Sequence, residues 1–356
     1  MDAPLSTARP RRLGTAWLAV AVVLVLVGIV CELLLGELSA TPAQVWAALT
    51  GGESEALTTV VHLRLWRGLV VAGVGASLAV AGVLVQGMFR NPLAGPSVLG
   101  LTSGAALMSV LALVLLGGGA QKLDLLGADL ELTLFAVPVA AFCGALLVAA
   151  IVWKLGLAGR RPSIPTTLLL GIALNIVCAG AQQFLQAMAL PDWEVSRSIL
   201  VWSFGSFDDR GAVHAALVWG GLCVALAITP FVARELDLLR GGSQDARALG
   251  VDDARVSRLA LLAAAAAVAT ATAVCGQIPF VGLLIPHLAR QAFGRAHGPL
   301  AFASALYGAA FLLWCDVLTR AAGWSGSLPP GVLMALVGGP AFLWLLHRTR
   351  REVQAW

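Results

Sequence analysis

A polar corner separates two long apolar segments in the first third of the chain. Residues 84–100 read Leu-Val-Gln-Gly-Met-Phe-Arg-Asn-Pro-Leu-Ala-Gly-Pro-Ser-Val-Leu-Gly, with apolar sequence on either side. Irregular backbone at membrane depth is tolerated only where it is buried in protein or lines a water-filled cavity. The corner therefore indicates a polytopic membrane protein with a pathway through it.

Composition agrees with a membrane protein throughout. The 356 residues are 59% hydrophobic and 12% charged, whereas a soluble domain has about 25% charged residues. Because a helix needs about 20 apolar residues to cross a bilayer, we predict an all-α fold with ten spans in one transmembrane domain, residues 1–356. The predicted spans are 14–35, 66–88, 97–117, 132–154, 166–190, 212–233, 258–275, 279–294, 299–319 and 329–347.

The distribution of positive charge predicts the orientation in the membrane. If the N-terminus lies inside and ten spans alternate, the inner segments hold 17 of the 23 Lys and Arg residues. This is the positive-inside bias, and it predicts that both termini lie in the cytoplasm. The net charge of +4 is modest, and no nucleic-acid partner is expected.

Three shorter segments are expected to be ordered outside the spans. Residues 41–50 predict an interfacial helix, with Thr41 as its cap and Pro42 in its first turn. Residues 190–211 are too short to span and too apolar for a simple loop, which favours a re-entrant or interfacial helix. On the inner side, Ser243, Gln244, Asp245, Ala246, Arg247, Ala248, Leu249 and Gly250 predict a short helix with an N-cap and a glycine stop. This helix is either a docking element or part of a solvated loop.

The sequence carries no catalytic site. Its only lysines, Lys122 and Lys154, do not stand in a phosphate-binding Gly-Lys-Ser/Thr motif, so any ATP must be used by another subunit. The five histidines are scattered without metal-ligand spacing, and the six cysteines are interpreted as small packing residues. We predict no metal site and no cofactor in this chain.

Polar residues in the spans are few, which bears on the transport mechanism. Gln86 and Asn175 are candidates for the pathway, although Asn175 could instead bond between helices. Asp316 and Arg320 stand one helical turn apart and predict a local ion pair. Because no run of carboxylates suggests a proton relay, a stand-alone secondary transporter or channel is the less favoured alternative.

Two arginines at the outer end of the second span are exceptions to the charge bias. Arg64 and Arg67 flank Leu-Trp, and Arg320 stands at the outer end of the ninth span. They are either snorkelling end-anchors or a cationic rim for an acidic soluble partner.

Three blocks of sequence follow one another along the chain. The first runs from Arg64-Leu-Trp-Arg67 through Gly75-Ala-Ser-Leu-Ala79 and Gln86 to Arg90-Asn-Pro-Leu-Ala94 and Leu99-Gly100. The second is Gly276-Gln-Ile-Pro-Phe280-Val-Gly-Leu-Leu-Ile285-Pro-His287-Leu-Ala-Arg290. The third comprises Asp316, Arg320, Leu328-Pro-Pro-Gly331 and Gly339-Pro-Ala-Phe-Leu-Trp344. Together the three blocks resemble the FecCD/BtuC-type permeases, the membrane subunits of type II ABC importers for iron–siderophores, haem and vitamin B12.

The resemblance implies a bacterial inner-membrane homodimer with the path on its axis. Two ATP-binding cassette subunits, which hold ATP and Mg²⁺, would lie beneath, and a periplasmic binding protein above. It also implies roles for single positions: Asn91, Leu93 and Ser163 at a cytoplasmic gate, residues 243–250 as the ATPase-coupling helix, and Arg64, Arg67 and Arg320 in binding-protein docking. The chain departs from the common family pattern at Trp66, at residues 296–298 and at Ser327. The expected docking contacts at 296–298 and 327 are therefore less closely defined by the resemblance.

The transported substrate is less closely defined than the class of transporter. The resemblance implies a large chelate or macrocycle as the transported substrate. Residues 196–207, Ser-Arg-Ser-Ile-Leu-Val-Trp-Ser-Phe-Gly-Ser-Phe, look most like haem-type members. Haem is therefore favoured, with a ferric siderophore next and cobalamin third.

Overall fold

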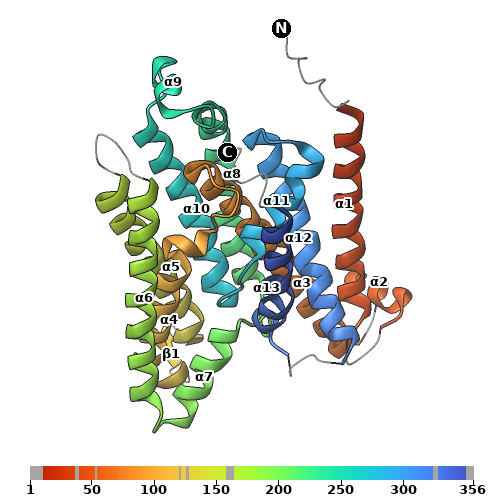
Figure 1. Ribbon diagram of the computed structural model, residues 1–356. Coiled ribbons are helices and arrows are strands. Elements are labelled where there is room, and N and C mark those ends of the chain that lie inside the picture. Colours follow the sequence, from red (N-terminus) through yellow and green to blue (C-terminus); the bar gives the residue numbers. More distant parts are fainter. Residues whose placement is uncertain are drawn as a thin grey trace.

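The computed structural model describes residues 11–36, 40–52, 54–119, 122–125, 128–157, 164–323 and 328–349. Its elements are α1 (Arg11–Leu34), α2 (Pro42–Thr50), α3 (Glu55–Phe89), η1 (Pro96–Leu99), α4 (Leu101–Leu115), η2 (Gly117–Gly119), β1 (Lys122–Leu125), β2 (Ala128–Glu131), α5 (Leu132–Val152), η3 (Trp153–Leu157), α6 (Ile164–Ala189), α7 (Trp193–Phe204), α8 (Ala212–Leu239), α9 (Ser243–Ala248), α10 (Asp253–Cys275), α11 (Val281–Phe293), α12 (His297–Ala321) and α13 (Pro330–Thr349). The fold is a helical bundle with one antiparallel hairpin, β1–β2 (Figure 1).

The ten predicted spans coincide with ten helices of the bundle. Among the described residues, seven helices are long and apolar enough to cross a membrane, and α4 and α13 are shorter apolar helices. The predicted span 279–294 corresponds to α11, which is shorter still. The all-α prediction is confirmed, because hydrophobic length alone determines most of these elements.

Several boundaries differ from the prediction. Helix α3 begins at Glu55 rather than near residue 66. The prediction started at the apolar run, and the first turns of the helix lie outside that run. The hairpin β1–β2 was not expected. Helix α2 does begin after Thr41, whose side chain accepts a hydrogen bond from the Gln44 backbone N–H in a capping box.

Helix α3 is the centre of the bundle. It contacts α1, α8, α10, α11 and α12, and 94% of its most apolar window is buried. Small residues allow these close approaches. A Cβ on Gly75 would lie 2.2 Å from the Gly308 carbonyl oxygen of α12, and one on Gly82 would lie 1.7 Å from the Gly282 carbonyl oxygen of α11. The backbones of three helices therefore meet without side chains between them.

The two ends of the bundle carry different short elements. Figure 1 shows α9 and the start of α1 at one end, and α2 and α7 at the opposite end. This arrangement agrees with the sequence prediction that places α9 and the N-terminus on one side and the 41–50 and 190–211 segments on the other. The end with α9 is called the α9 end below, and the end with α2 and α7 is called the α7 end.

The contact between α3 and α11 should be intolerant of a single methyl group. Gly82→Ala inserts a Cβ against backbone, so the helices must separate, and we expect destabilisation of about 1–3 kcal/mol or more. Gly220→Ala in α8 is the matched control, because a Cβ there meets nothing within 4 Å and alanine favours helix by up to about 1 kcal/mol. Thermal unfolding in detergent micelles would measure both, and equal melting temperatures would contradict the packing argument.

Candidate functional site

A cavity of about 610 Å³ lies where irregular backbone segments meet. Its lining includes Gly95–Ser97 after the polar corner, Gln277–Phe280 between α10 and α11, and Gly331 at the start of α13. Ser203 and Phe204 at the end of α7 complete one wall. Non-helical backbone inside a membrane bundle is tolerated where it lines a cavity, and such helix breaks are typical of transporter binding sites.

Glycines allow these segments to approach one another closely. Gly276 has φ +76°, and a Cβ there would lie 2.1 Å from the Trp202 carbonyl oxygen. A Cβ on Gly331 would lie 2.2 Å from the Phe204 carbonyl oxygen. The Ser206 N–H donates to the Cys275 carbonyl oxygen at 2.9 Å. The second and third sequence blocks thus bring α7, α10 and α13 together around the cavity.

The polar corner closes α3 with a left-handed residue. Arg90 has φ +50° and caps the helix, and the Asn91 N–H donates to the Gln86 carbonyl oxygen. The Asn91 side chain accepts a hydrogen bond from the Leu93 N–H at 2.9 Å. Both predicted gate residues are half-buried. The third, Ser163, lies outside the described residues, and the gate role of all three remains a prediction.

Arg90 connects this corner to α9. Its Nη2 donates to Ser243 Oγ at 2.7 Å. The prediction that Ser243 caps α9 is wrong, because Gly242 occupies the N-cap position and the Ser243 hydroxyl is used by Arg90 instead. Burial lowers the pKa of Arg90, as does the charge of Arg247, whereas Asp253 acts in the opposite direction.

The rest of α9 is attached by one face and exposed on the other. Ala246 is buried, and Arg247 Nη2 lies 2.9 Å from Asp253 Oδ2. Leu249 follows the helix with 70% of its surface exposed. Gly250, with φ +86°, provides the predicted stop. The helix is confirmed, and its exposed tip is available to a partner.

The two candidate pathway residues both bond between helices. Gln86 is fully buried; its Nε2 donates to the Leu283 carbonyl oxygen at 3.2 Å, and its Oε1 accepts from Arg290 Nη2 at 2.7 Å. Asn175 donates to the Ser97 carbonyl oxygen at 2.9 Å and accepts from Ser103 Oγ at 2.5 Å. The interhelical alternative for Asn175 is thus observed, and contact of either residue with cargo remains a prediction.

A histidine in the 296–298 segment, for which the sequence predicts no partner, joins α12 to α8. His297 is buried, and its Nδ1 lies 2.5 Å from Asp237 Oδ1. A Cβ on Gly87 would lie 2.5 Å from His297 Nε2, so the ring also lies against α3.

At the α7 end, Arg67 binds two carboxylates. Its Nε and Nη2 donate to the Asp316 carboxylate at 2.8 and 2.9 Å, and its Nη1 donates to Asp208 Oδ1 at 2.5 Å. The Asp316 side chain is 1% exposed, whereas that of Asp208 is 60% exposed. Burial raises the pKa of Asp208, but the hydrogen bond and charge of Arg67 outweigh it, and the net shift is downward.

Arg320 and Arg64 hold the end of α1. Arg320 Nη1 pairs with the Glu32 carboxylate, and Arg64 Nη1 donates to the Leu33 carbonyl oxygen at 3.1 Å. A Cβ on Gly36 would lie 2.5 Å from both guanidinium groups. The predicted Asp316–Arg320 pair is therefore wrong, because each residue finds a partner on another helix. Glu32 was missed, although a carboxylate inside an apolar span was a usable signal.

These pairings place the three predicted docking arginines inside the protein rather than on an open rim. Arg64 is buried, and the side chains of Arg67 and Arg320 are 19% and 10% exposed. Their docking role remains a prediction. Among the described residues, no group of three or more His, Cys, Asp or Glu side chains could hold a metal ion.

Comparison with known proteins identifies the kind of chain that carries this geometry. Residues 24–348 match the FecCD transport family. The hemin transport system permease protein HmuU of Yersinia pestis is 37% identical over 82% of this chain and 84% of its own length. The cobalamin import system permease protein BtuC of Halobacterium salinarum is 35% identical over 87% and 81%. The Fe(3+) dicitrate transport system permease protein FecD of Escherichia coli is 35% identical over 94% and 99%.

A solved structure shares the fold. A transporter described as a metal-chelate type ABC transporter, in an inward-facing conformation, matches with a TM-score of 0.79 and 27% identity, over 94% of this chain and 99% of that one.

The Arg67–Asp316 pair should be the energetically important one at the α7 end. Arg67→Met leaves a buried carboxylate without its partner, and we expect a loss of about 3–5 kcal/mol. Asp208→Asn should cost less than about 1 kcal/mol, because its ion pair is exposed. The double variant Arg67→Met/Asp316→Leu should recover most of the loss. Thermal unfolding of the purified variants tests this, and equal destabilisation by the two single changes would contradict it.

Proposed function

We propose that this ABC importer permease, which belongs to the FecCD transport family, moves a large iron chelate from periplasm to cytoplasm. Haem is the favoured cargo. Haem is supported by the 37% identity to a hemin permease. It is also supported by residues 196–207, which resemble haem-type members and supply Ser203 and Phe204 to the cavity. The cobalamin and ferric dicitrate relatives, at 35% identity, keep those cargo classes as alternatives.

The hydrogen bond between Arg90 and Ser243 is the observation that supports the proposed transport mechanism. We propose that ATP-binding cassette subunits dock on the exposed tip of α9, at Leu249. Movement of α9 would then be transmitted through Ser243 to Arg90, which immediately precedes Asn91 and Leu93. These two residues, together with Ser163, would form the inner gate. ATP and Mg²⁺ belong to the partner subunits in this proposal.

The unpartnered faces of α6 and α13 support a homodimer with the path between two copies. Only 11% of the most apolar window of α6 is buried in one chain. Large apolar side chains are exposed along α6, among them Leu169, Ile176 and Phe184, and on α13, among them Leu336 and Leu343. Because α13 and the end of α7 line the cavity, a partner copy against this face would enclose it.

The remaining parts of the assembly follow from the orientation. The charge bias supports placing the α9 end in the cytoplasm of a bacterial inner membrane and the α7 end in the periplasm. A periplasmic binding protein would then dock at the α7 end. The exposed Asp208 carboxylate lies there with Arg67 behind it, so docking through Arg64, Arg67 and Arg320 would require that network to open.

Reconstituted uptake would identify the cargo. Proteoliposomes with the permease, its ATPase and its binding protein are supplied with haem, a ferric siderophore or cobalamin, each with and without ATP. We expect ATP-dependent haem uptake to exceed the other two by about tenfold, a preference of about 1.4 kcal/mol. A higher rate for another chelate would overturn the haem assignment. Uptake without ATP or ATPase would instead favour a secondary transporter.

Two single changes in and beside α9 should separate docking from transmission. Leu249→Asp places a charge on the exposed tip, so we expect the ATPase to dissociate during co-purification. Ser243→Ala removes only the acceptor for Arg90, so the ATPase should remain bound and hydrolyse ATP while uptake per ATP falls severalfold. Thr59→Ala is the control, because its hydroxyl bonds only within α3 at the α7 end. Wild-type uptake by Ser243→Ala would exclude the proposed link.

A further inference from the structure

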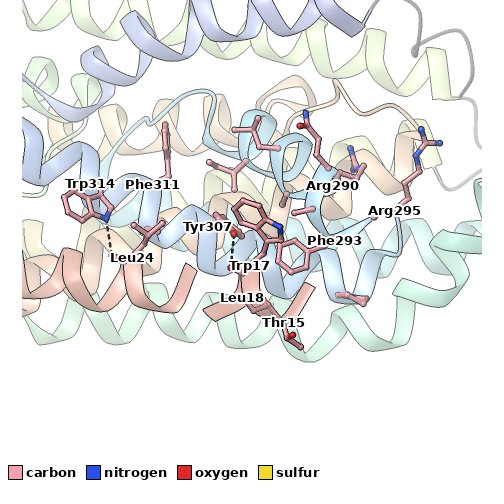
Figure 2. A pocket seen from close by; sticks show the side chains of 18 residues that line it. Thr15, Trp17, Leu18, Leu24, Arg290, Phe293, Arg295, Tyr307, Phe311 and Trp314 are labelled. Atoms are coloured by element: carbon pink, nitrogen blue, oxygen red, sulfur yellow. Dashed lines mark hydrogen bonds between the residues drawn. The ribbon is translucent and has the colours of Figure 1, made fainter. Parts of the chain in front are cut away.

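Aromatic side chains that carry hydrogen-bond donors line two cavities of the protein. In a groove between α1, α11 and α12, the Tyr307 hydroxyl donates to the Trp17 carbonyl oxygen at 2.9 Å. Trp314 Nε1 donates to the Leu24 carbonyl oxygen at 3.1 Å, and Figure 2 shows both bonds. A second cavity, of about 770 Å³, lies at the α7 end. There the buried Trp202 Nε1 has no hydrogen-bond partner among the described residues. A buried N–H without an acceptor is costly, so the second cavity is the one that indicates a ligand.

Helix α7 separates this second cavity, called the α7 pocket below, from the cavity at the corner. Residues 193, 194, 197, 198, 201 and 202 lie on one side of the helix and line the α7 pocket. Ser203 and Phe204 line the other cavity, and the two cavities share no lining residue. The exposed Trp193 is part of the lining, so the α7 pocket opens to the surface at the end where Figure 1 shows α7.

Arg210 brings a positive charge to the α7 pocket. It stands between α7 and α8, and its buried Nε has no hydrogen-bond partner among the described residues. The nearby Asp208 carboxylate is held by Arg67. Burial lowers the pKa of Arg210, and the charges of Asp208 and Asp209 act in the opposite direction. Within the described part of the chain, neither carboxylate forms an ion pair with Arg210, so its guanidinium is available to an anion.

His214 adds a further donor to the pocket. Its ring is buried, and its Nδ1 accepts a hydrogen bond from the Gly211 N–H at 3.3 Å. A ring nitrogen that accepts a hydrogen bond carries no proton, so the neutral imidazole has its proton on Nε2. The charge of Arg210 acts on His214, which indicates that the two side chains lie near each other. The pocket thus has three donor groups, on Arg210, His214 and Trp202.

The hydroxyl groups of the pocket are engaged, and its carboxylates lie at the surface. Ser198 Oγ donates to the Gly118 carbonyl oxygen at 2.7 Å. Ser206 Oγ donates to Asp208 Oδ2 at 3.0 Å. The remaining charged side chains that line the pocket are exposed, namely Glu194, Arg197 and Asp209. The interior therefore offers donors to a ligand, and the two exposed carboxylates disfavour a ligand with more than one negative charge.

We propose that the α7 pocket binds an organic carboxylate that has an apolar body. The planar guanidinium of Arg210 matches the two oxygens of a carboxylate, and Trp202 and His214 would donate to the same group. Leu113 and Val137 are among the apolar side chains of the lining. Small-molecule pockets of about 300–1,000 Å³ typically combine apolar walls with a few placed polar groups. The site does not depend on which cargo the permease moves.

Isothermal titration calorimetry of the full-length protein in nanodiscs tests this site, with empty nanodiscs as the baseline. The probes are 4-phenylbutyrate, its neutral amide 4-phenylbutyramide, and phenyl phosphate. We expect 4-phenylbutyrate to bind about tenfold more tightly than either of the others, because the amide cannot form charge-assisted hydrogen bonds and the phosphate carries more than one negative charge.

Changes at Arg210 should affect binding without affecting the fold. Arg210→Gln should weaken 4-phenylbutyrate binding about tenfold. Arg210→Lys, which keeps the charge but not the planar fork, should weaken it less. The melting temperature of both variants should remain that of the wild type, because neither change breaks an ion pair within the described part of the chain. Arg234→Gln, at an exposed position of α8 outside the pocket, should change neither quantity.

Three outcomes would overturn the proposal: equal affinity for the acid and the amide, unchanged affinity in Arg210→Gln, or tighter binding of phenyl phosphate. The acid and amide comparison needs only the wild-type protein. Haem and its dimethyl ester distinguish two sources of the carboxylate. Binding of haem but not of the ester, with loss in Arg210→Gln, would support the site and assign the carboxylate to a cargo. Binding of 4-phenylbutyrate alone would support the site and assign it to a separate small acid.

Discussion

The close approach of α3 to α11 and α12 is the constraint on which the other contacts depend. Gly75 meets Gly308, and Gly82 meets Gly282, at separations that leave no room for a Cβ. Close packing of this kind is stiff, since core side chains interdigitate at near-crystalline density. Helix α3 is consequently a fixed central element, and the polar networks at both ends of the bundle include residues of this helix.

The two networks differ in what they hold. At the α7 end, Arg64 and Arg67 connect α3 to α1 and α12 through buried groups. Arg67 also connects it to the segment before α8 through the exposed Asp208 carboxylate. At the α9 end, Gln86 connects it to α11 through two hydrogen bonds, and Arg90 connects it to α9 through one. Removing a partner from a buried ion pair costs about 3–5 kcal/mol, whereas a hydrogen bond with one charged partner, such as Arg90 to Ser243, contributes about 1.5–3 kcal/mol. The α7 end is therefore the anchored one, and motion is cheaper at the α9 end.

Local signals in the sequence predict helices and their ends correctly, whereas contacts between residues far apart in the chain are not predictable from it. Hydrophobic length predicted the positions of ten helices, seven of which are long and apolar enough to cross a membrane among the described residues. Thr41 and Gly250 predicted a helix start and a helix stop. The i, i+4 spacing of Asp316 and Arg320 predicted the wrong pair, because Arg67 and Glu32, far away in sequence, lie closer in the fold. The prediction that Ser243 caps α9 is wrong because its partner is also distant in sequence. Nothing in the neighbouring residues indicates that Arg90 reaches Ser243. Long-range partners are set by helix packing, which a single sequence does not display.

The proposed mechanism makes the corner a moving part, and the hydrogen bonding of the corner bears on that role. From Arg90 to Ala94 its backbone and the Asn91 side chain bond within the segment or to the last turn of α3. Beyond it, Asn175 holds the Ser97 carbonyl oxygen to α6. The segment thus lies between two fixed points, with Arg90 to Ser243 as its bond to α9. In the proposed mechanism the segment would shift with α9 together with the last turn of α3. Its hydrogen bonds would then stay intact, and no backbone group would lose its partner, which is the costly event inside a membrane protein.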